Sequence, residues 1–437
     1  MNLNTKYPRI LVISNNCFSK TDSNGRTLGN FFMGWPKERL AQFYIQNAYP
    51  DFDVCENYFR VTDSQALKSI FGKKRGGRVK KSDAVSDTVS NSAVSTNKTK
   101  RNALTMILRN IVWKIGFWKK CGFDLWVDEF CPQAVLLQAG DNSFMFALAR
   151  KTAEKYKAPL FIYNSEGYYF KNFDYFGAKG IAHLLYPIFR VGFCREFRRT
   201  QKHTAFNFYI CDGLKKAYDE EFDTPSVVLY TSSNVLPLEK ATPHNGFTVS
   251  YLGNLGVGRH EGLIEIANAL QDISENYYLN VYGKISNEAV KTAFDNCKGI
   301  RYQGFVSYDG VIEVMKNSDL LVHTESFSDF YKEDLKFAFS TKIADSLASG
   351  RCFLLYAPNT VECYKYLQQN QLAYTISSSD KLKETLSLLA SNQEARGKYT
   401  ENALKAVESN HSIKNNRIRF AEIICKISNE DNNGCAG

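Results

Sequence analysis

The chain has 437 residues, of which 44% are hydrophobic and 23% are charged, so it can bury two globular cores and is not a disordered protein. It contains no run of about 20 apolar residues, and its N-terminus leads directly into a strand-like segment, which excludes a membrane-spanning helix and gives no sign of a signal peptide. The eleven cysteines are scattered and the six histidines include no close pair, so we expect free thiols in a reducing cytoplasm and no zinc site.

The net charge of +10 is unevenly distributed. Residues 1–240 hold 35 Lys and Arg against 22 Asp and Glu, whereas residues 241–437 hold 20 against 23. This asymmetry indicates that the first half meets something anionic. Much of the excess lies in 72–101, and the Ser-, Lys- and Gly-rich composition of 72–100 predicts a flexible basic excursion.

In the first half, short β-rich segments alternate with helical patterns. We expect a turn at Asn24-Gly25 after the first strand, and then a helix that continues to about Arg39. The expected strands lie at 9–15, 42–46, 133–137 (with Gln138 after it), 159–164, 205–211 and 226–230. This alternation predicts a parallel sheet covered by helices.

The second half repeats this alternation more regularly. Its expected strands lie at 247–253, 278–283, 300–306, 319–325 and 352–358, and the chain is helical from about 380. We therefore predict an α/β fold with two Rossmann-like parallel-sheet domains facing a central cleft. The predicted parts are an N-terminal domain (1–230), a proline-containing linker (231–246), a C-terminal domain (247–400) and a helical tail (401–437) that can pack back on the first domain.

The most informative local pattern is the start of the helix that ends at Gly350. Ser340 or Thr341 can cap this helix, and Lys342 then lies in its first turn, at the positive end of the helix dipole. An anionic ligand bound to the free N–H groups and the ammonium would resolve that conflict. The alternative is a solvated surface lysine.

A glycine-rich turn follows the first strand of the second half. Gly253, Gly256 and Gly258 allow the backbone to approach a phosphate, with Asn254 in the same turn, and Arg259 can then hold two oxygens. A purely structural turn explains the glycines equally well.

Two carboxylates complete the candidate site in this half. His323 and Glu325 end the strand at 319–325, and Asp345 lies on the same expected helix as Lys342, one turn further along. Carboxylates accept hydrogen bonds from sugar or ribose hydroxyls, although a strand-end carboxylate can also simply cap a backbone N–H.

The first half offers polar residues after its own predicted strands. Glu166 precedes three aromatic residues, as in a sugar-stacking pocket, but it can equally be an ordinary loop carboxylate. The candidate acceptor residues are Asn24, Gly25, Arg26, Asp141, Ser143 and Glu166.

Two further stretches, 101–120 and 183–202, mix basic with aromatic and aliphatic residues. In the first, apolar residues recur at helical spacing on one face: Leu104, Leu108, Ile111, Ile115 and Trp118. Such a basic amphipathic helix suits an anionic membrane surface. Packing of that face on the protein's own core is the alternative.

The second half resembles the retaining family-4 glycosyltransferases, and this resemblance implies that the two predicted domains form a GT-B fold. The similarity follows chain order through Tyr251–Leu255, Arg259–Gly262, Leu279–Gly283, Ile300–Val306, Ser318–Glu325 and Lys342–Gly350, with weaker support from ILVISNN and residues 23–29. It implies that Arg259 and Lys342 bind the diphosphate and that Asp345 takes the place of the second Glu of the family's E-x7-E motif. The first Glu is replaced by Phe337, so we expect Glu325 to take the donor-sugar role and to be catalytic together with Arg259 and Lys342.

The same resemblance implies a metal-independent transfer, with retained configuration, from a nucleotide diphosphate sugar to a saccharide or lipid-linked saccharide. It implies a role in cell-surface polysaccharide synthesis, no bound cofactor, and a cytoplasmic protein that can contact the inner face of the membrane. Two alternatives stay open from the residues alone: a nucleotide-sugar epimerase of the same fold, and a non-catalytic protein that binds membranes or nucleic acid. We expect no nucleic-acid partner, because the basic residues concentrate in one flexible segment.

Overall fold

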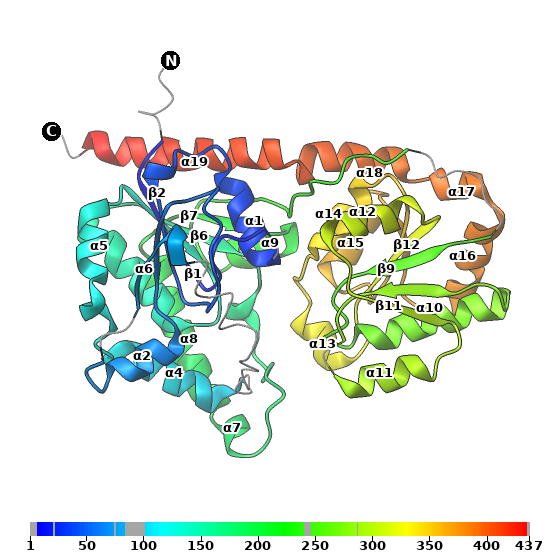
Figure 1. Ribbon diagram of the computed structural model, residues 1–437, viewed down its shortest axis with the longest axis horizontal. Coiled ribbons are helices and arrows are strands. Elements are labelled where there is room, and N and C mark those ends of the chain that lie inside the picture. Colours follow the sequence, from blue (N-terminus) through cyan, green and yellow to red (C-terminus); the bar gives the residue numbers. More distant parts are fainter. Residues whose placement is uncertain are drawn as a thin grey trace. The chain divides into compact units, whose positions relative to one another are not determined.

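The computed structural model describes residues 7–20, 22–73, 76–83, 101–239, 246–285 and 287–434. Contacts divide the chain into two units, Met1–Leu229 with Asn416–Gly437, and Tyr230–Asn415 (Figure 1). Each unit is built around its own sheet. Within the described part of the chain, no helix has both the length and the apolar composition needed to cross a bilayer.

The first unit contains an eight-stranded sheet in the order β4-β3-β2-β1-β5-β6-β7-β8. All neighbouring strands are parallel except β3 and β4. The strands are β1 (Ile10–Ser14), β2 (Leu40–Tyr44), β3 (Asn57–Arg60), β4 (Gly77–Val79), β5 (Ala134–Gln138), β6 (Leu160–Asn164), β7 (Thr204–Tyr209) and β8 (Ser226–Val228). The helices are α1 (Ser23–Phe32), α2 (Asp63–Ser69), α4 (Ala103–Ile115), α5 (Phe123–Phe130), α6 (Ser143–Tyr156), α7 (Ile181–Leu184), α8 (Tyr186–Gln201) and α9 (Asp212–Asp219).

The second unit contains a six-stranded, fully parallel sheet in the order β11-β10-β9-β12-β13-β14. Its strands are β9 (Val249–Leu252), β10 (Leu279–Tyr282), β11 (Ile300–Gly304), β12 (Leu320–Thr324), β13 (Cys352–Tyr356) and β14 (Tyr374–Ile376). Its helices are α10 (Arg259–Ile273), α11 (Glu288–Asp295), α12 (Tyr308–Lys316), α13 (Asp329–Asp334), α14 (Thr341–Ala348), α15 (Glu362–Gln369), α16 (Asp380–Ser391), α17 (Gln393–Gly397) and α18 (Thr400–Ala406). The predicted α/β class with two parallel sheets is confirmed.

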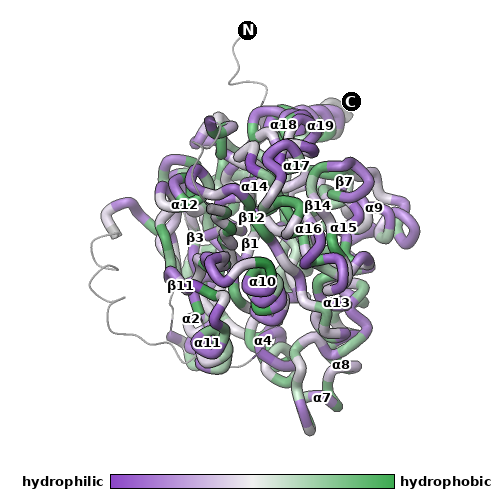
Figure 2. The backbone as a smooth tube through the Cα atoms, turned by 90° about the vertical axis from the view of Figure 1, so that its right-hand side faces the viewer, coloured by the Kyte–Doolittle hydropathy of each residue, from purple (hydrophilic) through white to green (hydrophobic). Residues whose placement is uncertain are grey.

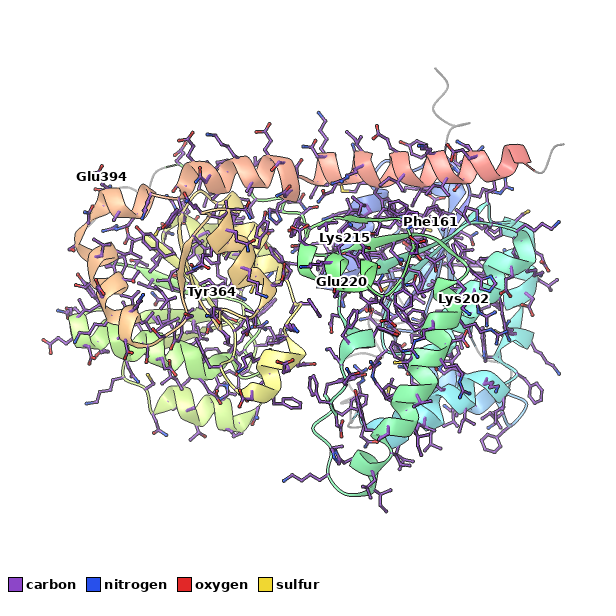
Figure 3. All side chains as sticks on the ribbon, turned by 180° about the vertical axis from the view of Figure 1, so that it is seen from behind. Phe161, Lys202, Lys215, Glu220, Tyr364 and Glu394 are labelled. Carbon is purple, nitrogen blue, oxygen red and sulfur yellow. The ribbon has the colours of Figure 1, made fainter. Side chains whose placement is uncertain are left out.

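Central strands buried on both faces explain the apolar runs in the sequence. All five residues of β1, β5, β6, β12 and β13 are buried. Figure 2 shows hydrophobic residues, in green, at the buried strand β12, and in Figure 3 Phe161 of β6 lies in the interior, whereas Lys202 lies at the exposed end of α8.

Helix α19 (Ile413–Gly434) follows α18 near the end of the chain, and from Asn416 it counts with the first unit. Its Phe420 stacks on Phe31 of α1 at a centroid distance of 5.0 Å and also contacts Phe208 of β7. Phe420 and Ile424 are fully buried in the core of the first unit. The core of this unit is therefore completed by residues about 200 positions beyond its last strand.

The structure corrects two local expectations near the N-terminus. Asn24 and Gly25 do not form a turn but lie in the first turn of α1, because Asp22 caps this helix by accepting a bond from the Gly25 N–H at 3.0 Å. The helix ends at Phe32 instead of Arg39, because Gly34 follows with φ of +82° and Pro36 lies just beyond.

Three short strands have no counterpart among the expected strands, namely β3, β4 and β14. Strand β4 lies inside the stretch predicted as a flexible excursion and pairs antiparallel with β3, so that Val79 faces Tyr58. Residues 74–75 and 84–100 of that predicted excursion lie outside the described residues.

The segment after the first unit is fixed by a buried histidine. His411 is fully buried, its Nδ1 lies 2.7 Å from the Thr231 carbonyl oxygen, and its Nε2 lies 2.9 Å from the Tyr366 hydroxyl. Burial lowers the pKa of His411 to about 4, although the bond to Thr231 opposes this shift. Residues 231–233 are thereby tied to the end of α18 and its continuation.

This histidine predicts a pH-dependent stability. The folded pKa lies below the unfolded value near 6.5, so its contribution is complete above pH 6.5 and is lost as the pH falls towards 4. In wild type, this histidine should lower the unfolding free energy by about 3 kcal/mol between pH 6.5 and pH 4. We expect this part of the acid destabilisation to be absent in His411→Gln, as measured by urea denaturation at both pH values. His203 is about half exposed, so His203→Gln should keep the pH dependence of wild type. If His411→Gln also kept the wild-type pH dependence, His411 would not be the group responsible.

Candidate functional site

The site lies where the strand order of the second unit changes direction. From β9 the chain proceeds to β10 and β11 on one side of the sheet, whereas β12, β13 and β14 are added on the other side. The carboxyl ends of β9 and β12 are therefore adjacent, and the loops that follow them diverge. Ligands of open α/β sheets bind in the crevice at such a switch point.

The loop after β9 approaches its neighbours so closely that its glycines are required. Gly258 caps α10 with φ of +74°, and a Cβ at this position would lie 2.5 Å from the Ser326 hydroxyl. A Cβ on Gly253 would lie 2.7 Å from the Tyr251 hydroxyl, and the Gly256 N–H donates to Asn254 Oδ1 at 2.9 Å. This loop therefore places exposed backbone directly before the N-terminus of α10.

Arg259, the first residue of α10, forms a buried ion pair with Glu325, the residue after β12. Its Nε and Nη2 each donate to one carboxylate oxygen of Glu325 at 2.9 Å. His323 Nε2 lies 3.1 Å from Glu325 Oε1, and the imidazole stacks on the Tyr251 ring at 6.0 Å. The side chain of Glu325 is 2% exposed, that of His323 4% and that of Arg259 11%.

Electrostatics keep this pair ionised. Burial by itself would raise the pKa of Glu325, but the Arg259 guanidinium and the bond from His323 outweigh it and lower the pKa to about 2. Burial likewise opposes the charge on Arg259, but the Glu325 carboxylate raises the pKa of that guanidinium. Burial lowers the pKa of His323 in spite of Glu325, so the imidazole is neutral at physiological pH.

A second cation begins α14. Ser340 caps this helix by accepting a bond from the Lys342 N–H at 3.3 Å, as predicted, with Thr341 as the first helical residue. Lys342 Nζ lies 3.8 Å from Asp345 Oδ2, and Ser233 Oγ donates to Asp345 Oδ1 at 2.8 Å. Asp345 therefore offsets part of the unfavourable interaction between Lys342 and the helix dipole.

The structure brings the predicted donor-site residues together at one edge of the sheet. The charges of Arg259 and Lys342 both lower the pKa of His323, so both cations lie near that ring. The site consists of cations, a neutral imidazole, backbone N–H groups and two carboxylates that already have partners. Such a set can hold an anion with several oxygens, and the described residues contain no group of three or more His, Cys, Asp or Glu able to hold a metal ion.

Sequence reasoning missed three residues of this site. Ser233 lies in the segment interpreted as a linker, and it contacts Asp345 across 112 positions of sequence. Tyr251 supports His323, and Ser326 defines the space around Gly258. No local pattern distinguishes these residues, because only the pairing of β9 with β12 brings them together.

The acceptor candidates of the first unit surround its own switch point, between β1 and β5. Asp141 is buried, is paired with Arg101, and accepts a bond from the Tyr175 hydroxyl at 2.9 Å. Ser143 begins α6, and Glu166 Oε2 lies 3.4 Å from Lys171 Nζ.

The other three candidates lie together at the start of α1. Asn24 is exposed and Arg26 is half-buried. Gly25 is buried, and a Cβ there would lie 2.2 Å from the Cys17 carbonyl oxygen. The first turn of α1 therefore packs directly on the loop after β1.

Two amide oxygens near these candidates were not predicted. Gln138 ends β5 and Asn164 ends β6, and both side chains are buried. Within the part of the chain that the structure describes, Gln138 Oε1 and Asn164 Oδ1 lack a hydrogen-bond partner. Unsatisfied buried acceptors are uncommon, and a ligand hydroxyl or a water molecule is the usual partner.

The ion pair of Arg259 and Glu325 predicts a large effect on stability. In Glu325→Gln the guanidinium remains buried without a carboxylate, so we expect the unfolding free energy to fall by about 3 kcal/mol. Chemical denaturation at pH 7 measures this loss. Glu333→Gln, an exposed carboxylate on α13, is the matched control and should stay within about 0.5 kcal/mol of wild type; equal stability of the two variants would contradict a role for the pair.

A family model described as "Glycosyl transferase-like" matches residues 259–422. The match begins at Arg259 and includes Glu325, Lys342 and Asp345. No curated protein sequence matches the chain.

Solved structures show the same fold over nearly the whole chain. HepE from Anabaena, in complex with UDP, has a TM-score of 0.62 at 9% identity and covers 96% of this chain and 100% of its own. Sucrose-phosphate synthase from Thermosynechococcus elongatus has a TM-score of 0.61 at 8% identity, with 96% and 99% covered. WaaG, a glycosyltransferase of lipopolysaccharide biosynthesis, has a TM-score of 0.57 at 13% identity, with 95% and 99% covered.

These likenesses establish the architecture of the chain. Sequence identities this low are evidence for a shared fold and not for a shared activity. The chain is therefore a two-domain protein of GT-B fold in which residues 259–422 are similar to the glycosyl transferase-like family.

Proposed function

We propose that this protein is a glycosyltransferase that moves a sugar from a nucleotide diphosphate sugar to a saccharide or lipid-linked saccharide acceptor. The observation that carries this proposal is the position of Arg259: a guanidinium held by Glu325 at the N-terminus of α10, at the switch point of the sheet. Lys342 begins a second helix near the same histidine. A diphosphate is the ligand whose charge and oxygens match these groups.

The proposed chemistry follows from this charge distribution. When the bond between the sugar and the diphosphate breaks, negative charge develops on the leaving oxygen, and Arg259, Lys342 and the two helix N-termini stabilise it. The bidentate pair with Glu325 uses Nε and Nη2 of Arg259, so Nη1 is not committed to the carboxylate. These fixed charges would do the work of a metal ion, and we propose a metal-independent reaction.

In the proposed retaining reaction, the acceptor hydroxyl attacks from the face that the diphosphate leaves. Its proton passes to the departing phosphate oxygen, so no protein base is required. This fits a site in which both carboxylates already have partners and His323 is buried.

Glu325 then has a different role from the one implied by the resemblance. Both of its oxygens bond to Arg259, and Oε1 also lies beside His323. We therefore propose that Glu325 positions Arg259 for the diphosphate. In the same way, we propose that Asp345 positions Lys342 at the start of α14, while it accepts a hydrogen bond from Ser233.

The structural neighbours support the substrate class and the pathway. HepE was solved with UDP and with UDP-glucose, and WaaG is involved in lipopolysaccharide biosynthesis. We propose a uridine or related nucleoside diphosphate sugar as donor, and a role in cell-surface polysaccharide synthesis on the cytoplasmic side of the membrane.

The donor site predicts stabilisation by a nucleoside diphosphate. At about a hundred times its dissociation constant, one of UDP, GDP or ADP should stabilise wild type by nearly 3 kcal/mol in a thermal-shift assay without metal. We expect Lys342→Ala to weaken this stabilisation, because an ammonium contact to the diphosphate is lost. Lys381→Ala, on α16, is the control and should respond like wild type. No shift with any nucleotide would refute the donor site.

The proposed chemistry also predicts the reaction's response to chelators. With the donor that stabilises the protein, nucleoside diphosphate release should be unchanged by excess EDTA, because no charge in the site depends on a metal. Proton NMR of the first product should show the anomeric configuration of the donor. A loss of activity in EDTA that Mg²⁺ restores would contradict metal independence, and an inverted product would contradict retention.

A further inference from the structure

Helix α4 in the first unit has two apolar faces, and the fold uses only one of them. Ala103, Met106 and Trp113 are buried, and Trp113 stacks on Phe144 of α6 at 4.5 Å. The other face carries an apolar stripe at helical spacing whose residues are 39% to 55% exposed: Leu104, Leu108, Ile111 and Ile115. The stripe predicted from sequence therefore stays exposed to water, except for Trp118, which packs in the core beside Phe43 and Phe123.

A second exposed apolar stripe lies on the neighbouring helices α7 and α8. Its residues recur at the same spacing and are 58% to 73% exposed: Ile181, Leu184, Ile188 and Val191. Helices α4, α7 and α8 are in contact and lie at the lower end of the first unit in Figure 1. We call the surface formed by these two stripes the α4–α8 face.

A groove of about 650 Å³ connects the two stripes, between α4, α6 and α8. Ile111 and Ile188 both line it, together with the ring of Phe144. Exposed apolar side chains that gather in this way, unlike single ones, mark an interaction site.

The segments that form this face carry a large excess of positive charge, part of which is paired with carboxylates of neighbouring segments. Residues 101–121 hold five Lys and Arg and no Asp or Glu, and residues 179–202 hold six against the single Glu196. Glu196 is itself paired with the buried Arg150 at 3.0 Å. The exposed cations that line the groove are Lys114, Lys119, Lys151 and Arg199.

We propose that the α4–α8 face docks on an anionic lipid bilayer, with the apolar stripes in the headgroup region and the cations on the phosphates. Exposed apolar side chains with cations beside them match the two parts of a bilayer surface, the acyl boundary and the phosphates. A second copy of this chain would bring the same positive charge against itself, which disfavours it as the occupant. Docking of this kind gives the protein access to acceptors held in a membrane, but it stands independently of the donor and the reaction.

The test is co-sedimentation of the full chain with vesicles, without any nucleotide. Wild type should sediment with vesicles of equimolar phosphatidylcholine and phosphatidylglycerol, and far less with phosphatidylcholine alone or at high salt. Ile111→Ser with Ile188→Ser should lower the partition coefficient at least about tenfold, because two exposed apolar side chains no longer enter the bilayer. Lys114→Gln with Lys151→Gln should lower it about twentyfold.

The control is Leu388→Ser with Lys381→Gln, which removes an exposed leucine and a lysine from α16 and should bind like wild type. All substituted side chains are exposed, and circular dichroism verifies that each variant is folded. The proposal is overturned if wild type does not sediment with anionic vesicles or if the α4–α8 variants bind like the control. A dimer that the isoleucine substitutions abolish, without vesicle binding, assigns the face to a second copy and also overturns it.

Discussion

The buried pair of Arg259 and Glu325 is the interaction on which the second unit's site depends. A guanidinium and a carboxylate removed from water lose several kcal/mol of hydration each, and only bidentate geometry with further hydrogen bonds offsets that loss. The two bonds of 2.9 Å and the contact from His323 meet this requirement. The pair therefore fixes the N-terminus of α10 against the end of β12, and both elements border the switch point.

Small residues make this close approach possible. A Cβ at Gly262, in the first turn of α10, would lie 2.3 Å from the Thr324 hydroxyl, and one at Gly258 would collide with Ser326. Because neither glycine has a side chain, the backbone of α10 can pack directly against the side chains at the end of β12. The same packing brings the N-terminus of α10 to the edge of the sheet where we propose that the diphosphate binds.

The switch points of the two units differ in their chemistry. In the second unit the charged groups are cations supported by carboxylates. In the first unit the end of β1 meets the loop after β5 through amides, with Asn142 Nδ2 donating to Asn15 Oδ1 at 3.0 Å, while Asp141 is paired with Arg101. Neutral donors and acceptors suit a ligand rich in hydroxyl groups, and cations suit a diphosphate. This difference agrees with the proposed division between acceptor and donor domains.

The sequence by itself determined the α/β class, most strands, and the positions of Arg259, Glu325 and Lys342 at the ends of elements, because strand burial and helix caps leave local patterns. It did not predict β3, β4 or β14, which have only three or four residues each and owe their pairing to distant neighbours. Only the tertiary structure decided that Glu325 is bound to Arg259, that Ser233 contacts Asp345, and that α19 completes the first core. It also decided which face of α4 is exposed, because both faces are apolar and periodicity cannot distinguish a stripe against the core from one in water.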